Sequence, residues 1–155
     1  MSSSKKTIVG PKELNWLAAA LKLDSILSDN PALEALLMSF PALSLETWPA
    51  GEAVIREGDA GDDFFVVYRG RLSVLRKGDS PAARRVGRLG PGDFFGEVGL
   101  LMKSCRSATV RTEAECRLFR FPAVEFRGLL RRNKMLDRWV KRVACKRLIK
   151  LFKGE

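Results

Sequence analysis

The sequence contains no histidine, and this absence limits the chemistry available to the chain. Histidine is the usual general base near neutral pH and the commonest metal ligand in proteins. Cysteine is also scarce, and Cys105, Cys116 and Cys145 form no C-x-x-C pair. An odd, scattered set of cysteines is typical of reduced thiols. We therefore expect a cytoplasmic protein with no catalytic residues and no metal site.

Long apolar segments are missing as well. No stretch of about 18 uncharged apolar residues occurs, so we expect no membrane span. The first six residues contain serine and lysine with no hydrophobic region after them, which argues against a secretory signal. A length of 155 residues with 46% hydrophobic residues is typical of one soluble globular domain.

Positive charge is concentrated near the C-terminus. Residues 123–155 contain eleven lysines and arginines against three acidic residues, so they supply +8 of the formal net charge of +10. A solvated helix face, a lid over a ligand, and an electrostatic contact with acidic lipid or nucleic acid are all compatible with this charge. The sequence does not choose among them.

Hydrophobic periodicity divides the chain into segments and predicts an α+β fold that is mainly β. Residues 1–10 are expected to be a flexible tail, and residues 11–42 an N-terminal helical segment with helices beginning near Pro11 and after Asn30. Residues 43–122 show short alternating runs between turns rich in Gly, Asp and Pro. The candidate strands are Leu43–Thr47, Ala53–Glu57, Phe64–Arg69, Leu72–Arg76, Arg85–Leu89, Ala108–Glu113 and Cys116–Phe121. Residues 123–155 return to helical spacing, with helices predicted over 123–132 and 134–153 and Asn133 as the N-cap of the second.

The segment 95–110 has the sequence F-G-E-V-G-L-L-M-K-S-C-R-S-A-T-V and suggests a phosphate site. Residues 96–101 are predicted to form a short helical turn whose unpaired N–H groups attract an anion, and its two glycines permit close approach. Arg106 can bind a phosphate through two parallel N–H bonds. A carboxylate in the same site, Glu97, needs a hydroxyl donor beside the phosphate. A cyclic 3′,5′-phosphate with a free ribose 2′-OH meets both requirements.

This segment resembles the phosphate-binding cassette of the cyclic-nucleotide-binding domain family. The similarity extends upstream to the pattern G-E-x-x-I-x-x-G-D-x-G-D-x-F-x-V-x-x-x-G-x-x-x-V over residues 51–74, and covers about residues 33–150 in all. The resemblance implies an eight-stranded, jelly-roll-like β-roll with the cassette at 95–110, flanked by N-terminal helices and two C-terminal helices. Residues 123–155 would then be the hinge and lid helices.

The resemblance also implies roles for individual residues. Glu97 would bind the 2′-OH, Arg106 the exocyclic phosphate oxygen, and Ser107 would donate its backbone N–H. The ligand contacts implied in the cassette are Phe95, Gly96, Glu97, Val98, Gly99, Leu100, Cys105, Arg106, Ser107 and Ala108. The candidate lid contacts near the purine are Trp139, Lys141, Arg142 and Val143.

Two positions depart from the family pattern, and one bears on ligand choice. Cys105 replaces the usual proline and Gly99 the usual alanine, but neither change removes a ligand contact. In the family, threonine after the cassette arginine tends to accompany cGMP and alanine tends to accompany cAMP. Ser107 lies between these cases, and we favour cAMP over cGMP as the ligand, with no other cofactor.

The sequence therefore predicts a cyclic-nucleotide sensor whose C-terminal helix moves when ligand binds and passes the signal to an effector domain or protein partner. The alternative is a protein-interaction domain on the same scaffold that docks acidic partners through its basic C-terminal helix. The sequence resembles the cyclic-nucleotide modules of ion channels, kinases and exchange factors equally. Too few residues follow the long helix for a helix-turn-helix, so we expect no sequence-specific DNA binding.

Overall fold

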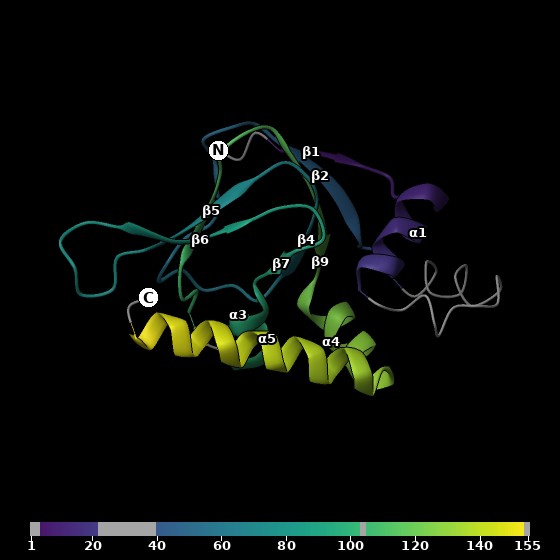
Figure 1. Cartoon of the computed structure of the whole chain (residues 1–155). Helices are drawn as coiled ribbons and strands as arrows, with labels where there is room; N and C mark the ends of the chain where they lie inside the picture. The colour runs from purple at the N-terminus through teal and green to yellow at the C-terminus, as the bar shows by residue number, and fades with distance from the viewer. Residues whose placement is uncertain (1–3, 22–39, 103–104, 154–155) are drawn as a thin grey trace.

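A computed structural model describes residues 4–21, 40–102 and 105–153, and it contains two antiparallel sheets with helices at both ends of the chain (Figure 1). The first sheet has the order β1-β2-β9-β4-β7 and the second has the order β3-β8-β5-β6. The strands are β1 (Lys5–Thr7), β2 (Ser44–Trp48), β3 (Ala53–Ile55), β4 (Phe64–Arg69), β5 (Leu72–Arg76), β6 (Arg84–Leu89), β7 (Phe94–Phe95), β8 (Thr109–Thr112) and β9 (Cys116–Phe121). The helices are α1 (Pro11–Ala20), α3 (Glu97–Met102), α4 (Ala123–Arg132) and α5 (Lys134–Lys153). The predicted α+β, mainly β class is confirmed.

Strand β4 is buried on both of its faces. Its side chains alternate between the two sides of the sheet, as successive strand residues must. Phe64 and Val66 pack with the helices in the first hydrophobic core. Phe65 and Val67 pack between the two sheets in the second core. An uninterrupted apolar strand of this kind therefore needs the helical layer as well as the second sheet.

The helical layer is held against β4 and β9 by amphipathic spacing. In α4 the buried residues Ala123, Phe126, Leu129 and Leu130 recur at one helical face. The ring of Phe126 stacks on that of Phe64 with centroids 3.8 Å apart. Helix α5 buries Leu136, Val140 and Ala144 at intervals of one turn. Figure 1 shows α5 running along one edge of the molecule beside α3 and α4. This packing places the last helix next to the predicted cassette.

The N-terminal prediction needs correction. Residues 1–10 were expected to be a flexible tail, whereas Lys5–Thr7 form β1 and pair antiparallel with β2. All three residues are exposed, so the sequence has no hydrophobic pattern that would predict this strand. Backbone pairing with an open sheet edge and burial of the nearby Val9 hold it in place. The predicted second N-terminal helix falls in residues 22–39, which lie outside the described residues.

The junction between α4 and α5 is also arranged differently from the prediction. The carbonyl of Asn133 accepts the N–H of Asp137, as expected for the first residue of the second helix. Its side-chain amide instead donates to the Leu129 carbonyl at the end of α4, 3.1 Å away. Asn133 thus caps the C-terminus of α4 with its side chain.

Among the residues that the structure describes, none of the helices combines the length and the hydrophobicity that a membrane span needs.

Candidate functional site

The segment from β7 to β8 forms the predicted cassette around a backbone turn at Gly96. Gly96 has a φ of +92°, in the left-handed region that favours glycine. A Cβ built at this position would lie 2.5 Å from the Asp63 carbonyl oxygen and 3.1 Å from Nη1 of Arg106. Residues 97–102 then form α3, as the sequence predicts for this stretch. Glycine at position 96 therefore allows α3 and the β3–β4 loop to approach each other closely.

Replacing Gly96 with alanine should lower the free energy of unfolding by about 2 kcal/mol or more, because the new side chain combines backbone strain with a clash against backbone. Thermal or urea denaturation measures this loss. Gly90→Ala is the matched control, since a Cβ there meets nothing within 4 Å and Gly90 has no positive φ. We expect that variant to stay within about 0.5 kcal/mol of wild type. Equal effects of the two substitutions would contradict a tight turn at Gly96.

The Arg106 guanidinium is buried and held by backbone carbonyl groups. Its side chain donates to the Asp63 carbonyl at 3.2 Å and to the Gly96 carbonyl at 3.4 Å. The backbone of Arg106 is fixed by two further hydrogen bonds with Gly58 and Asp59. Burial lowers the pKa of Arg106, and the nearby Asp63 and Asp62 carboxylates oppose that shift. Because arginine stays charged in proteins, the site contains a buried, oriented positive charge.

A network of ion pairs around Arg120 supports the loop that contacts Arg106. Arg120 of β9 bridges two carboxylates, with Nη2 2.7 Å from Asp63 and Nη1 3.5 Å from Glu46. Glu46 is fully buried inside the roll and accepts a hydrogen bond from the Trp48 indole. Since Arg106 in turn contacts the Asp63 carbonyl, these pairs fix the loop that orients the Arg106 side chain.

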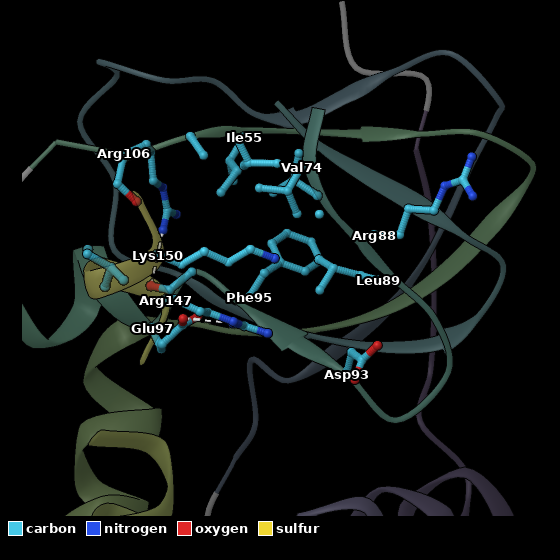
Figure 2. Close-up of a pocket in the computed structure, with 18 residues that line it drawn as sticks. Ile55, Val74, Arg88, Leu89, Asp93, Phe95, Glu97, Arg106, Arg147 and Lys150 are labelled. Atoms are coloured by element: carbon cyan, nitrogen blue, oxygen red, sulfur yellow. Dashed lines mark hydrogen bonds and ion pairs between the residues drawn. The ribbon is translucent and has the colours of Figure 1, made fainter. Parts of the chain in front are cut away.

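Glu97 is the buried carboxylate of the site, with 2% of the residue exposed. Its Oε1 accepts a hydrogen bond of 2.7 Å from Nη1 of Arg147 on α5, shown as a dashed line in Figure 2. The Arg147 guanidinium also lies over the Phe94 ring at 5.1 Å. The carboxylate at the start of α3 is thus tied directly to the C-terminal helix.

Glu97 and Arg106 line the same pocket, which has a volume of about 240 Å³. Figure 2 shows the two side chains toward one end of it, with Ile55, Val74 and Phe95 along the remaining wall. Second-sheet residues give the pocket an apolar surface, and Arg88, Arg106, Arg147 and Lys150 surround it with four cations against the two carboxylates Asp93 and Glu97. Such a pocket suits a ligand with a flat apolar part and an anionic group.

The structure brings most of the predicted cassette residues together around this pocket. Those that line it are Phe95, Gly96, Glu97, Val98, Gly99, Arg106, Ser107 and Ala108. Cys105 is exposed and does not line the pocket. The side chain of Leu100 lies outside what the structure describes. Contact between any of these residues and a ligand remains a prediction.

The four candidate lid residues on α5 do not line the pocket in this structure. Trp139 packs edge-on against Phe94 at 5.2 Å, and Val143 packs against the first hydrophobic core. Lys141 pairs with Asp137, and Arg142 is exposed. The pocket is reached by Arg147 and Lys150, further along the helix. Which residues of α5 line the pocket depends on the point along the helix at which α5 crosses the β-roll.

Sequence reasoning missed Arg147, although the sequence contains a signal for it. Arg147 follows Val140 by seven residues and Ala144 by three, so it falls on the buried stripe of the helix. A cation on an apolar stripe is stabilised by an acidic partner on the element packed against it. The remaining wall comes from four strands, β3, β5, β6 and β8, whose convergence depends on sheet pairing. Its residues are Ile55, Val74, Val86, Arg88, Leu89 and Val110.

Comparison with known proteins agrees with this geometry. Residues 45–133 match the family model described as "Cyclic nucleotide-binding domain". The chain is 35% identical over 111 residues to the human potassium/sodium hyperpolarization-activated cyclic nucleotide-gated channel 3, a match that covers 72% of this chain and 14% of the channel. It therefore spans about one seventh of the length of that curated relative.

Solved structures show the same architecture. The regulatory domain of Toxoplasma gondii PKA, crystallised with cAMP, superposes with a TM-score of 0.64 at 28% identity, covering 77% of this chain and 45% of that one. A cyclic nucleotide-binding domain from Methylobacillus flagellatus superposes with a TM-score of 0.70, covering 97% of this chain and 82% of that one. At 17% identity, this second match supports the fold alone.

Proposed function

The chain belongs to the cyclic nucleotide-binding domain family, and from this premise we propose that it is a non-catalytic cytoplasmic sensor that binds cAMP in preference to cGMP. The observation that supports this most strongly is that a buried carboxylate, Glu97, and a buried guanidinium, Arg106, line the same pocket. A cyclic nucleotide presents a hydroxyl donor and an anion on a single sugar. The pocket has one complementary group for each.

In this proposal the phosphate binds Arg106 and the backbone near Gly96 and Gly99. The guanidinium needs little rearrangement because the Asp63 and Gly96 carbonyls already hold it at the pocket wall. A preorganised side chain loses less conformational freedom on binding, which favours affinity. The purine would then lie against the apolar wall that includes Ile55, Val74 and Val110.

The proposed coupling to the C-terminal helix runs through Glu97. Its Oε1 accepts from Arg147 of α5, and the ribose 2′-OH would donate to the same carboxylate. Ligand binding thus changes the energy of an ion pair that joins α3 to α5. The ligand shifts α5 only by its difference in affinity for the two helix positions. An effector domain or protein partner attached to α5 would detect that movement.

Replacing Arg147 with glutamine should loosen α5 in the ligand-free protein, because Glu97 would be left buried without its charged partner. We expect backbone hydrogen exchange over residues 140–150 to become about tenfold faster, as the local opening energy falls by roughly 1–2 kcal/mol. Exchange measured by mass spectrometry checks this. Lys146→Gln, a change at the exposed neighbouring residue, should leave the exchange rates at their wild-type values. Unchanged exchange in Arg147→Gln would remove the ion pair from the coupling.

Calorimetric titration with both nucleotides tests the ligand itself. We expect cAMP to bind more tightly than cGMP, in line with Ser107 after the cassette arginine and with the similarity to a regulatory domain crystallised with cAMP. Tighter binding of cGMP would reverse the preference while leaving the sensor intact. Absence of binding by either nucleotide would favour the alternative, a protein-interaction domain on this scaffold.

A further inference from the structure

The solvent side of α5 has a composition that the nucleotide site does not explain. At 3.6 residues per turn, one arc of the helix contains Lys134, Met135, Arg138, Lys141, Arg142, Cys145, Lys146 and Ile149. All eight are exposed, and we call this arc the basic face. It lies opposite the buried stripe of Leu136, Val140 and Ala144. The nucleotide pocket and the basic face therefore use different sides of one helix.

The basic face combines five cations with two exposed apolar side chains. Between residues 134 and 153 the sequence contains a single acidic residue, Asp137, which lies at the flank and pairs with Lys141 at 2.9 Å. Met135 and Ile149 are 75% and 54% exposed. They lie near the two ends of the arc, about 21 Å apart along the helix axis at 1.5 Å per residue. Single exposed apolar side chains are common on protein surfaces, so the five cations characterise this face, and Met135 and Ile149 add one apolar group near each end of it.

We propose that the basic face of α5 adsorbs to an anionic lipid surface. Clusters of four to eight lysines and arginines on a helix are a recognised pattern for acidic headgroups. The convex side of a single straight helix can lie on a plane, so all five cations and both apolar ends can contact it together. Figure 1 shows α5 along the edge of the molecule, where such a plane has access.

A nucleic-acid partner is less favoured by the same residues. Base edges are read by asparagine, glutamine and arginine, and single strands by stacked aromatic rings. The basic face contains two arginines, Arg138 and Arg142, but no asparagine, glutamine or aromatic residue. Met135 and Ile149 have an apolar partner in the acyl region of a bilayer, whereas a phosphate backbone offers them none.

The test is co-sedimentation of the full chain with phosphatidylcholine vesicles, with or without about one third phosphatidylserine. Binding is expected to require phosphatidylserine and to weaken with salt. The triple variant K134Q/R138Q/K146Q should reduce the partition coefficient about a hundredfold, since each base near an anionic surface contributes roughly a factor of five. The control K5Q/K12Q/K77Q removes the same net charge from exposed lysines elsewhere and should retain most of the binding. Equal losses in the two variants, or no binding to anionic vesicles, would overturn the proposal.

The variant M135Q/I149Q separates lipid from nucleic acid. It should lower partitioning into phosphatidylserine vesicles several-fold while leaving any weak binding to a short DNA duplex unchanged. Tighter binding to DNA than to vesicles, with no effect of this variant on either, would assign the face to nucleic acid and refute the lipid proposal. Calorimetry with cAMP on the same variants tests the nucleotide site independently, because none of the changed residues lines the pocket.

Discussion

Replacing Arg106 with alanine is expected to weaken cAMP binding by several hundredfold or more. The ligand phosphate would enter a pocket that has lost its buried cation, and an unpaired charge in such a site costs about 3–5 kcal/mol. Arg106 is 7% exposed, so little solvent is available to replace it. Calorimetric titration of wild type and variant measures the difference. Arg106→Lys should fall between them, because it retains the charge and loses the two-pronged geometry.

The controls for this prediction come from the same part of the chain. Arg111 of β8 is exposed, and Arg111→Ala should bind cAMP as wild type does. The side chain of Arg106 also donates to the Asp63 and Gly96 carbonyls, so the unfolding temperature of Arg106→Ala must be measured beside its affinity. A folded Arg106→Ala variant with wild-type affinity would refute the proposed phosphate site.

The second large effect is expected at Glu97 and concerns the ribose. Glu97→Gln should weaken cAMP binding by about 1.5–3 kcal/mol, the usual contribution of a hydrogen bond to a charged group. Wild type should bind 2′-deoxy-cAMP correspondingly more weakly than cAMP. In Glu97→Gln the two ligands should bind with similar affinity, because the carboxylate that distinguishes them is absent. Competition binding with both ligands on both proteins gives the comparison.

Glu97→Gln also weakens the contact with Arg147, and this effect has to be separated from loss of the ribose contact. Arg147→Gln leaves the Glu97 carboxylate in place, so that variant should still prefer cAMP over 2′-deoxy-cAMP. The proposed role of Glu97 fails if wild-type protein does not distinguish the two nucleotides.

Much of the fold follows from local sequence patterns. Helices α4 and α5 have the predicted bounds because Pro122 precedes one, Asn133 separates the two, and each has a regular apolar stripe. The strands Phe64–Arg69, Leu72–Arg76 and Cys116–Phe121 are also found as predicted. Strand β1 was not predicted, since its stability depends on pairing with β2 and not on its own side chains.

Some residues of the candidate site were also predictable from local sequence, and others depend on tertiary contacts. The cassette was recognisable because its glycines, Glu97 and Arg106 are close in sequence and form one local turn. The candidate lid contacts near the purine were placed at residues 139–143, whereas Arg147 and Lys150 of α5 line the pocket and Arg147 pairs with Glu97. A helix pattern states which side is buried but not how far along its axis another element crosses it.

The sequence alone determined the fold class, the position of the cassette and the basic character of the C-terminal segment, because each depends on residues within a few positions of one another. Tertiary structure decided that Glu97 pairs with Arg147, fifty residues away, and that strands β3, β5, β6 and β8 converge on one pocket wall. Those contacts depend on the register of the sheets and on the crossing point of α5. Both are set by packing of the whole core, which no short segment specifies.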